Sequence, residues 1–163
     1  MAAVSVLTID RISIRAPLAR VFEVAADIER WPRILAHYRW VRFLERDAAG
    51  GGGGATGGVV EMAAWRPFGP VRYPAWWVSR MTVDHAAGEI RYRHERGITR
   101  GMDVVWRVVA RGPGTDVTVE HRWSGPPWPL VGGWIARGLI GPVFVHGIAS
   151  RTLAGIKRHL ERT

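Results

Sequence analysis

The C-terminal stretch from Pro129 to Thr163 constrains the fold most, because it carries the period of an α-helix and follows a long run of strand-like segments. Its apolar residues recur at spacings of three, four and once six, which predicts an amphipathic helix, continuous or broken near Gly141-Pro142. A single amphipathic helix after antiparallel strands needs a curved sheet to lie against. We therefore expect an α+β fold in which a curved antiparallel sheet and this helix enclose a ligand cavity. The apolar stripe is Ile135, Leu139, Val143, Ala149, Leu153, Ile156 and Leu160.

The chain ahead of this helix alternates between apolar and polar residues in seven segments, which is typical of half-buried strands. Short connections between consecutive segments favour antiparallel pairing. Two short helices are predicted between the first and second strands, with Pro17 in the first turn of one and Asp27 as the N-cap of the other. We expect them to plug one end of the curved sheet. The predicted strands are 5–15, 38–46, 59–66, 71–84, 89–95, 102–111 and 116–124.

Length and composition narrow the class of protein. The 163 residues are enough for one domain with its own core, and no boundary is visible within 1–163. The absence of Cys excludes disulfides, thiolate metal sites and thiol nucleophiles. No signal peptide is recognisable at the N-terminus, and Arg137 and His146 interrupt the longest apolar run, so a cytoplasmic location is expected. The glycine run 50–54 lacks the Lys and the following helix that a phosphate-binding loop requires.

The net charge of +9, from 23 Lys and Arg against 14 Asp and Glu, raises the question of an anionic partner. The basic residues are mostly Arg and are scattered rather than gathered in a run. We therefore expect no specific nucleic-acid binding. Weak association with an anionic surface, such as a ribosome or a membrane, stays open.

Three segments of the sequence resemble the START/polyketide cyclase (SRPBCC) superfamily. Residues 14–22 are similar to its I-x-A-P-x-x-x-V-F entry, and residues 26–32 to its D-x-x-x-W-P segment before the second strand. Residues 139–144 resemble the polyketide cyclase/dehydrase and coenzyme Q-binding subgroup. Together with the order of elements, the resemblance covers nearly the whole chain and implies the helix-grip fold.

The resemblance and the nine Trp residues imply a protein that binds a hydrophobic molecule such as an aromatic polyketide, a quinone or a lipid. The alternative is an aromatase/cyclase-type enzyme that folds a polyketide chain and promotes aldol closure and dehydration. A second alternative is an interaction protein that uses its basic surface. No cofactor is expected, and exposed Trp would favour a homodimer.

His121, Tyr92 and His94 are the candidates for proton transfer or for hydrogen bonds to a ligand. His121 is two residues away from both Val119 and Trp123, so in a strand it lies on the same face as they do. A metal site made of His94, His121 and His146 is not favoured, because no close spacing supports it. Packing roles for all of them remain an alternative.

Flat aromatic walls suit a planar ligand, and the predicted wall contains several Trp residues. Arg66, Arg72 and Arg107 lie near them in sequence, but solvated strand faces are the favoured interpretation. Only Glu61 and Asp103 could turn inward through a register slip, and no Gly-x-Ser-x-Gly nucleophile is present. The predicted ligand-binding residues are Trp31, Trp65, Tyr73, Trp77, Tyr92, His94, Trp106, His121, Trp123, Val143 and His146, with Trp128 near the cavity mouth.

Overall fold

The computed structural model describes residues 6–48, 55–68, 70–124 and 141–162, without the side chains of Phe68 and of residues 141–145. The described elements are one strand, three short helical segments, six further strands and a long helix. This order confirms the predicted α+β fold. The elements are β1 (Val6–Ile14), α1 (Leu18–Ala26), η1 (Ile28–Arg30), α2 (Trp31–Ile34), β2 (Tyr38–Arg46), β3 (Gly58–Phe68), β4 (Val71–Asp84), β5 (Glu89–Gly97), β6 (Asp103–Arg111), β7 (Gly114–Trp123) and α4 (Gly141–Glu161).

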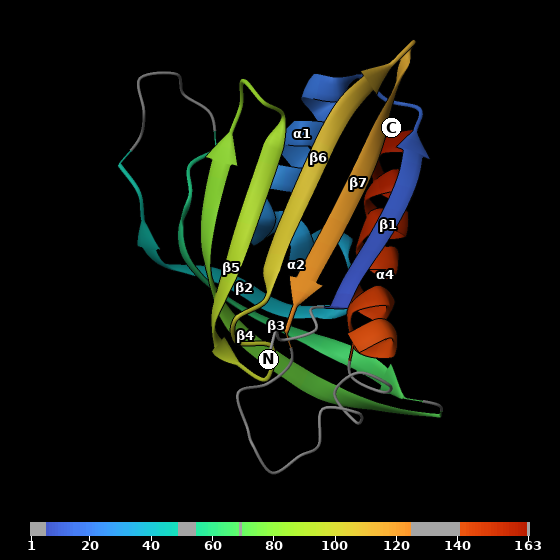
Figure 1. Ribbon diagram of the computed structural model, residues 1–163. Coiled ribbons are helices and arrows are strands. Elements are labelled where there is room, and N and C mark those ends of the chain that lie inside the picture. Colours follow the sequence, from blue (N-terminus) through green and yellow to red (C-terminus); the bar gives the residue numbers. More distant parts are fainter. Residues whose placement is uncertain (1–5, 49–54, 69, 125–140, 163) are drawn as a thin grey trace.

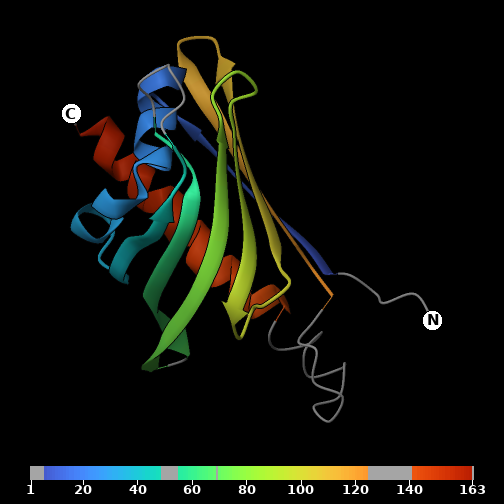
Figure 2. The same cartoon turned by 90° about the vertical axis from the view of Figure 1, so that its left-hand side faces the viewer.

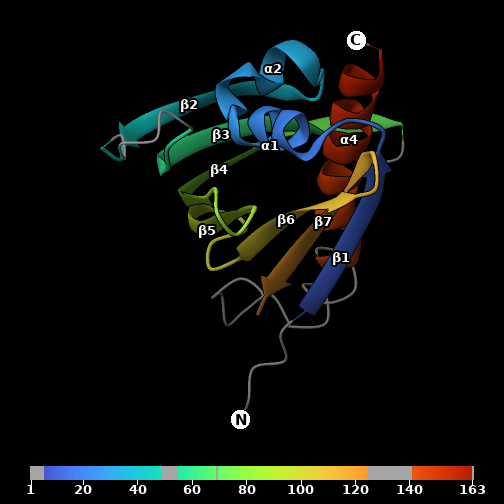
Figure 3. The same ribbon diagram turned by 90° about the horizontal axis from the view of Figure 1, so that it is seen from above.

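All seven strands form one antiparallel sheet in the order β1-β7-β6-β5-β4-β3-β2. Strands β2 to β7 follow one another as a meander, while β1 pairs with β7 at the far edge (Figure 1). The chain must therefore cross from one edge of the sheet to the other between β1 and β2. It does so through α1, η1 and α2, which lie at one end of the curved sheet (Figure 3).

Helix α4 crosses the concave side of the sheet obliquely (Figure 2). The predicted stripe is confirmed where the structure describes it, because Ala149, Leu153, Ile156 and Leu160 are all buried. Ile135, Leu139 and the side chain of Val143 lie outside the described residues. The close approach of α4 to α2 depends on Gly155, where an added Cβ would overlap the side chain of Leu35.

Two local predictions differ from the structure. Asp27 precedes η1 but makes no capping hydrogen bond, and its carboxylate instead lies 3.7 Å from Arg30 Nη1. The third strand, predicted to end at residue 66, is longer, because β3 continues through Pro67, which stands opposite Arg72. Strand β2 pairs with β3 only as far as Ala64, so Pro67 lies where that side of β3 has no neighbouring strand and its missing N–H costs no ladder bond.

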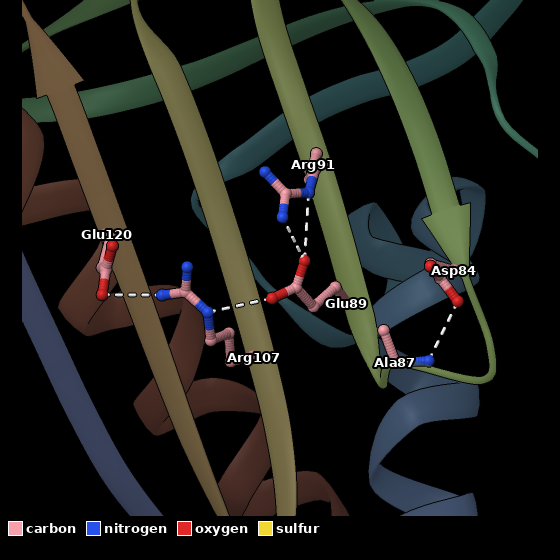
Figure 4. A network of polar contacts seen from close by, with 6 residues as sticks. All are labelled: Asp84, Ala87, Glu89, Arg91, Arg107 and Glu120. Atoms are coloured by element: carbon pink, nitrogen blue, oxygen red, sulfur yellow. Dashed lines mark hydrogen bonds and ion pairs between the residues drawn. The ribbon is translucent and has the colours of Figure 1, made fainter.

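The convex face of the sheet carries ion pairs that span several strands. Glu89 of β5 accepts hydrogen bonds from Arg91 at 2.5 Å and from Arg107 of β6 at 2.9 Å (Figure 4). Arg107 also pairs with Glu120 of β7 at 2.7 Å. The predicted outward position of Arg107 is therefore confirmed. At the β4–β5 turn, the Ala87 N–H donates to Asp84 (Figure 4).

Candidate functional site

A cavity of about 80 Å³ lies between the concave face of the sheet and α4. Its wall is mostly aromatic and aliphatic, with a few hydroxyl and imidazole groups. An engineered apolar cavity of about 150 Å³ holds one benzene ring, so this cavity, at about half that volume, accommodates a keto group or the end of a longer molecule rather than a whole ring. The lining residues are Trp31, Tyr38, Met62, Trp77, Tyr92, His94, Thr99, Met102, Val104, Trp106, Val119, His121, Ile148, Ala149 and Thr152.

Strand pairing places Tyr92 and His121 in one row across the sheet. Tyr92 of β5 stands opposite Val104 of β6, and Val104 stands opposite His121 of β7. Residues in such a row point to the same face, and two strand spacings separate Tyr92 from His121 by about 10 Å. The shorter Val104 between two longer polar side chains leaves room for a ligand group between the phenol and the imidazole.

The Tyr92 hydroxyl and His121 Nδ1 are buried, and neither has a hydrogen-bond partner among the described residues. An unsatisfied buried polar group costs about 1–3 kcal/mol. Most such groups in folded proteins are paired with protein or with water, so two of them lining one cavity point to a polar partner that enters it. An oxygen-bearing ligand or ordered water would satisfy both.

His94 is held more firmly than His121. Its Nδ1 lies 2.6 Å from Thr99 Oγ1, and its ring stacks on Trp77 with centroids 6.0 Å apart and planes within 6°. Burial lowers the pKa of His94 to about 3. Burial, with a smaller contribution from His94, also lowers the pKa of His121 to about 3. Both imidazoles are therefore neutral at neutral pH.

On the α4 side, three residues form a polar chain that reaches the cavity. His37 Nε2 lies 3.0 Å from Thr152 Oγ1, which lies 3.3 Å from the Tyr38 hydroxyl. Thr152 Oγ1 also lies 2.8 Å from the carbonyl of Ile148, to which it donates. Because Thr152 has one proton, this arrangement leaves its oxygen to accept from Tyr38 and His37. Burial raises the pKa of Tyr38, so its hydroxyl remains protonated.

The structure brings six of the predicted residues to this cavity: Trp31, Trp77, Tyr92, His94, Trp106 and His121. Four others lie elsewhere. The indole of Trp65 contacts the guanidinium groups of Arg39 and Arg72, and Tyr73 is exposed. Trp123 is buried and donates to the carbonyl of Arg100, at 3.1 Å.

His146, which was predicted to face the cavity from α4, does not line it. His146 points to Asp10 on β1 and is largely exposed. The side chain of Val143 and all of Trp128 lie outside the described residues. Within the described part of the chain, no group of three or more His, Asp or Glu side chains could hold a metal ion, and no helix is long and apolar enough to cross a membrane.

Two buried charged residues were not predicted. Arg66 was expected on a solvated face, but it is 3% exposed, because it continues the inward alternation of Met62 and Ala64 on β3. Burial lowers its pKa to about 10. Asp10 likewise continues the inward face of β1, whereas Glu61 and Asp103 face outward in ion pairs with Arg residues. Alternation counted from Ala64 for Arg66, and from Ile12 and Ile14 for Asp10, would have placed both residues on the inward face.

Comparison with known proteins identifies related sequences. Residues 14–145 match the family described as polyketide cyclase / dehydrase and lipid transport. A protein of Streptomyces halstedii named "Putative polyketide cyclase" is 32% identical over 101 residues, which cover 61% of this chain and 84% of the relative.

Two crystal structures have a similar fold. The Zhui aromatase/cyclase from Streptomyces sp. R1128 is 21% identical, with a TM-score of 0.78 over 97% of this chain and 94% of that one. TTHA0849 from Thermus thermophilus is 18% identical, with a TM-score of 0.76 over 96% and 97% of the two chains. At these identities the similarity establishes the helix-grip fold and leaves the ligand to be argued from the cavity.

Proposed function

The chain belongs to the polyketide cyclase / dehydrase and lipid transport family, and we propose that it binds a hydrophobic, carbonyl-bearing small molecule between the sheet and α4. One observation carries the proposal: the Tyr92 hydroxyl and His121 Nδ1 line a mostly apolar cavity, buried and without a partner among the described residues. A ligand carbonyl would accept a hydrogen bond from the phenol. The Trp31, Trp77 and Trp106 side chains would contact its planar, apolar part.

Burial favours a neutral ligand group at this site. Charged groups are costly to transfer into an apolar cavity, whereas a ketone or a quinone oxygen needs only one or two donors. Burial also raises the pKa of Tyr92 well above its ordinary value, so the phenol stays protonated and acts as a donor. Because the cavity is only about 80 Å³, it would take one keto group at the end of a longer molecule.

A matched pair of ligands tests this proposal. Pentan-2-one and 2-methylpent-1-ene have nearly the same size and shape, but only pentan-2-one carries a carbonyl oxygen. We expect the ketone to bind about two- to tenfold more tightly in calorimetric or ligand-observed NMR titrations, since one hydrogen bond contributes about 0.5–1.5 kcal/mol. Tyr92→Phe should remove the preference and leave the binding of 2-methylpent-1-ene unchanged. Equal affinities for the two ligands in the native protein would contradict the proposal.

Catalysis of aldol closure and dehydration is the second candidate function, and the placement of Tyr92 and His121 around one gap favours it. In such a reaction a base removes a proton from the carbon between two carbonyls, and that carbon attacks a third carbonyl. The new alkoxide takes up a proton, and loss of water then gives the double bond. Tyr92 would donate to the carbonyl that is attacked, and His121 would be the base.

The lowered pKa of His121 favours the first candidate, binding. A general base is most effective when its pKa lies near the working pH, and the pKa of His121 is about 3 in the folded protein. Binding is therefore the function that the cavity supports best, and catalysis requires a ligand that raises this pKa. Turnover of a poly-β-ketone that survives unchanged in the double variant Tyr92→Phe, His121→Gln would exclude both residues from catalysis.

A further inference from the structure

A second hollow, separate from the cavity, opens on the surface beside α4 and the β3–β4 hairpin. Its volume is about 460 Å³. We call it the basic groove, because the ionisable side chains that line it in the described part of the chain are His37, Arg72 and Arg151. Its lining residues are Ala36, His37, Trp65, Pro67, Pro70, Val71, Arg72 and Arg151.

Among the residues that the structure describes, no carboxylate pairs with the cations around the basic groove. Most other Arg side chains on the sheet are paired, for example Arg42 with Glu61 and Arg80 with Asp47. In the described ranges, none of the Asp or Glu side chains lies within ion-pair distance of the groove's two Arg residues, nor of the nearby Arg39 and Arg158. An uncompensated cluster of this kind attracts anions.

Trp65 fixes part of this cluster in place. The guanidinium of Arg39 lies 4.6 Å from the centre of the Trp65 ring, and that of Arg72 lies 5.2 Å from it. Stacking on an indole limits the freedom of an Arg side chain while leaving its N–H donors available. The groove therefore presents positioned donors beside an apolar wall of proline and valine.

His37 reports on the charge in the groove. Burial lowers its pKa to about 4, and the positive charges of Arg151 and Arg158 contribute to this shift. Its other contacts are uncharged: Thr152 Oγ1 and the ring of Tyr38, whose centroid lies 4.7 Å away. The positive charge of the basic groove is therefore not neutralised by the described carboxylates. Arg72 contributes further positive charge from the β3–β4 hairpin.

We propose that the basic groove is a binding site for a compact oxyanion of the phosphate type carried on an organic group. Arg72 and Arg151 would bind the oxyanion, and Trp65 with its proline neighbours would contact the attached group. Planar guanidinium groups suit tetrahedral oxyanions because they donate pairs of parallel hydrogen bonds. The site is distinct from the carbonyl-binding cavity, although His37 and Thr152 connect the two.

The test is a histidine NMR titration with inorganic phosphate against chloride at equal ionic strength, with the His37 signal assigned through His37→Gln. A bound anion offsets the charges of Arg151 and Arg158, so the pKa of His37 should rise from about 4 toward its ordinary value. The double variant Arg72→Gln, Arg151→Gln should weaken phosphate binding by roughly a hundredfold, since each charged hydrogen bond contributes about tenfold or more.

The matched control is Arg11→Gln, Arg122→Gln, which removes the same charge from exposed positions on β1 and β7. This variant should bind phosphate like the native protein. Flotation with phosphatidylcholine vesicles, with or without phosphatidic acid, identifies the source of the phosphate. Binding only to phosphatidic acid would identify a lipid headgroup, and binding of free phosphate a soluble ester. No response to either probe, or equal losses in both double variants, would overturn the proposal.

Discussion

His146 on α4 joins Asp10 on β1, with its Nδ1 atom 2.5 Å from Asp10 Oδ1. The pair is asymmetric, because the His146 side chain is 66% exposed and that of Asp10 only 4%. Burial raises the pKa of Asp10, and this effect outweighs the opposing attraction of His146. The second carboxylate oxygen of Asp10 has no hydrogen-bond partner among the described residues. A buried charge thus connects the helix to the edge strand that flanks it.

Asp10→Asn should maintain or increase the free energy of unfolding at neutral pH. The folded pKa of Asp10 lies above its unfolded value, so the folded protein holds this proton more tightly than the unfolded chain. The contribution of Asp10 to stability therefore decreases as the pH rises across that interval, and the neutral amide avoids the loss. Urea denaturation at pH 7 measures the difference. A loss of more than about 2 kcal/mol would show that the ion pair outweighs the burial cost.

The partner substitution gives the matched control. His146→Ala leaves the Asp10 carboxylate buried without its partner, so it should cost about 1–3 kcal/mol in the native background. In the Asp10→Asn background the same substitution should cost much less. Equal effects in both backgrounds would mean that His146 acts through something other than Asp10.

The fold could be predicted because its signals are local. The alternation of β7 and the spacing of Leu153, Ile156 and Leu160 each follow from one segment, and the structure confirms both. The predicted end of β3 is too early, because a proline such as Pro67 favours the end of a strand, whereas β3 has a free side there. Whether β3 has a neighbouring strand at Pro67 depends on where β2 ends, and that pairing is set by the tertiary structure rather than by the local sequence.

The site was predictable only in part. Tyr92, His94 and His121 follow from alternation, and the structure places all three in the cavity wall. Tyr38 and Thr152 were not identified, because they meet only when α4 packs against the start of β2. Trp65 was predicted to line the cavity, but its strand neighbours Ala64 and Arg66 face inward, so Trp65 lies on the opposite face of β3. The basic groove, which Trp65 lines, depends on the β3–β4 hairpin.

Stability should fall as the pH is lowered from 6.5 toward 5. The folded pKa is about 3 for His94 and His121 and about 4 for His37, all below the ordinary value of 6.5. The unfolded chain therefore takes up protons that the folded protein does not, at up to about 1.4 kcal/mol per pH unit for each His. Well above pH 6.5 these groups contribute no pH dependence. Urea denaturation at half-unit steps measures the slope.

The interval from pH 5 to 6.5 isolates the imidazoles in the Asp10→Asn background, because Asp10 has a raised pKa whereas carboxylates with lowered pKa values, such as Glu61 and Glu161, titrate lower. His121→Gln should reduce the slope by about one third, since it removes one of three contributors. An unchanged slope in His121→Gln would mean that His121 is accessible to protons in the folded state.

Tyr92→Phe should separate stability from ligand binding. Its hydroxyl is buried and has no hydrogen-bond partner among the described residues, so its removal should leave the free energy of unfolding unchanged or raise it by about 1 kcal/mol. Binding of a ketone should weaken, because the ligand oxygen loses its phenol donor. Tyr38→Phe is the contrasting variant, because the Tyr38 hydroxyl bonds to Thr152 and its loss should destabilise the fold by about 1 kcal/mol.

Two glycines of α4 should respond to alanine with opposite signs. An alanine Cβ at Gly155 would overlap Leu35 Cδ2, and Leu35 is buried against α4, so it cannot move away freely. Overpacking of this kind costs about 1–3 kcal/mol and exceeds the gain of about 1 kcal/mol in helix propensity.

At Gly147 the nearest atom to an added Cβ is Arg66 Nη2 at 3.8 Å, an ordinary contact, so the propensity gain should dominate. Thermal denaturation should therefore show a lower Tm for Gly155→Ala and a higher one for Gly147→Ala. If both variants were stabilised, Leu35 would have another rotamer available and the tight seating of α4 on α2 would be wrong.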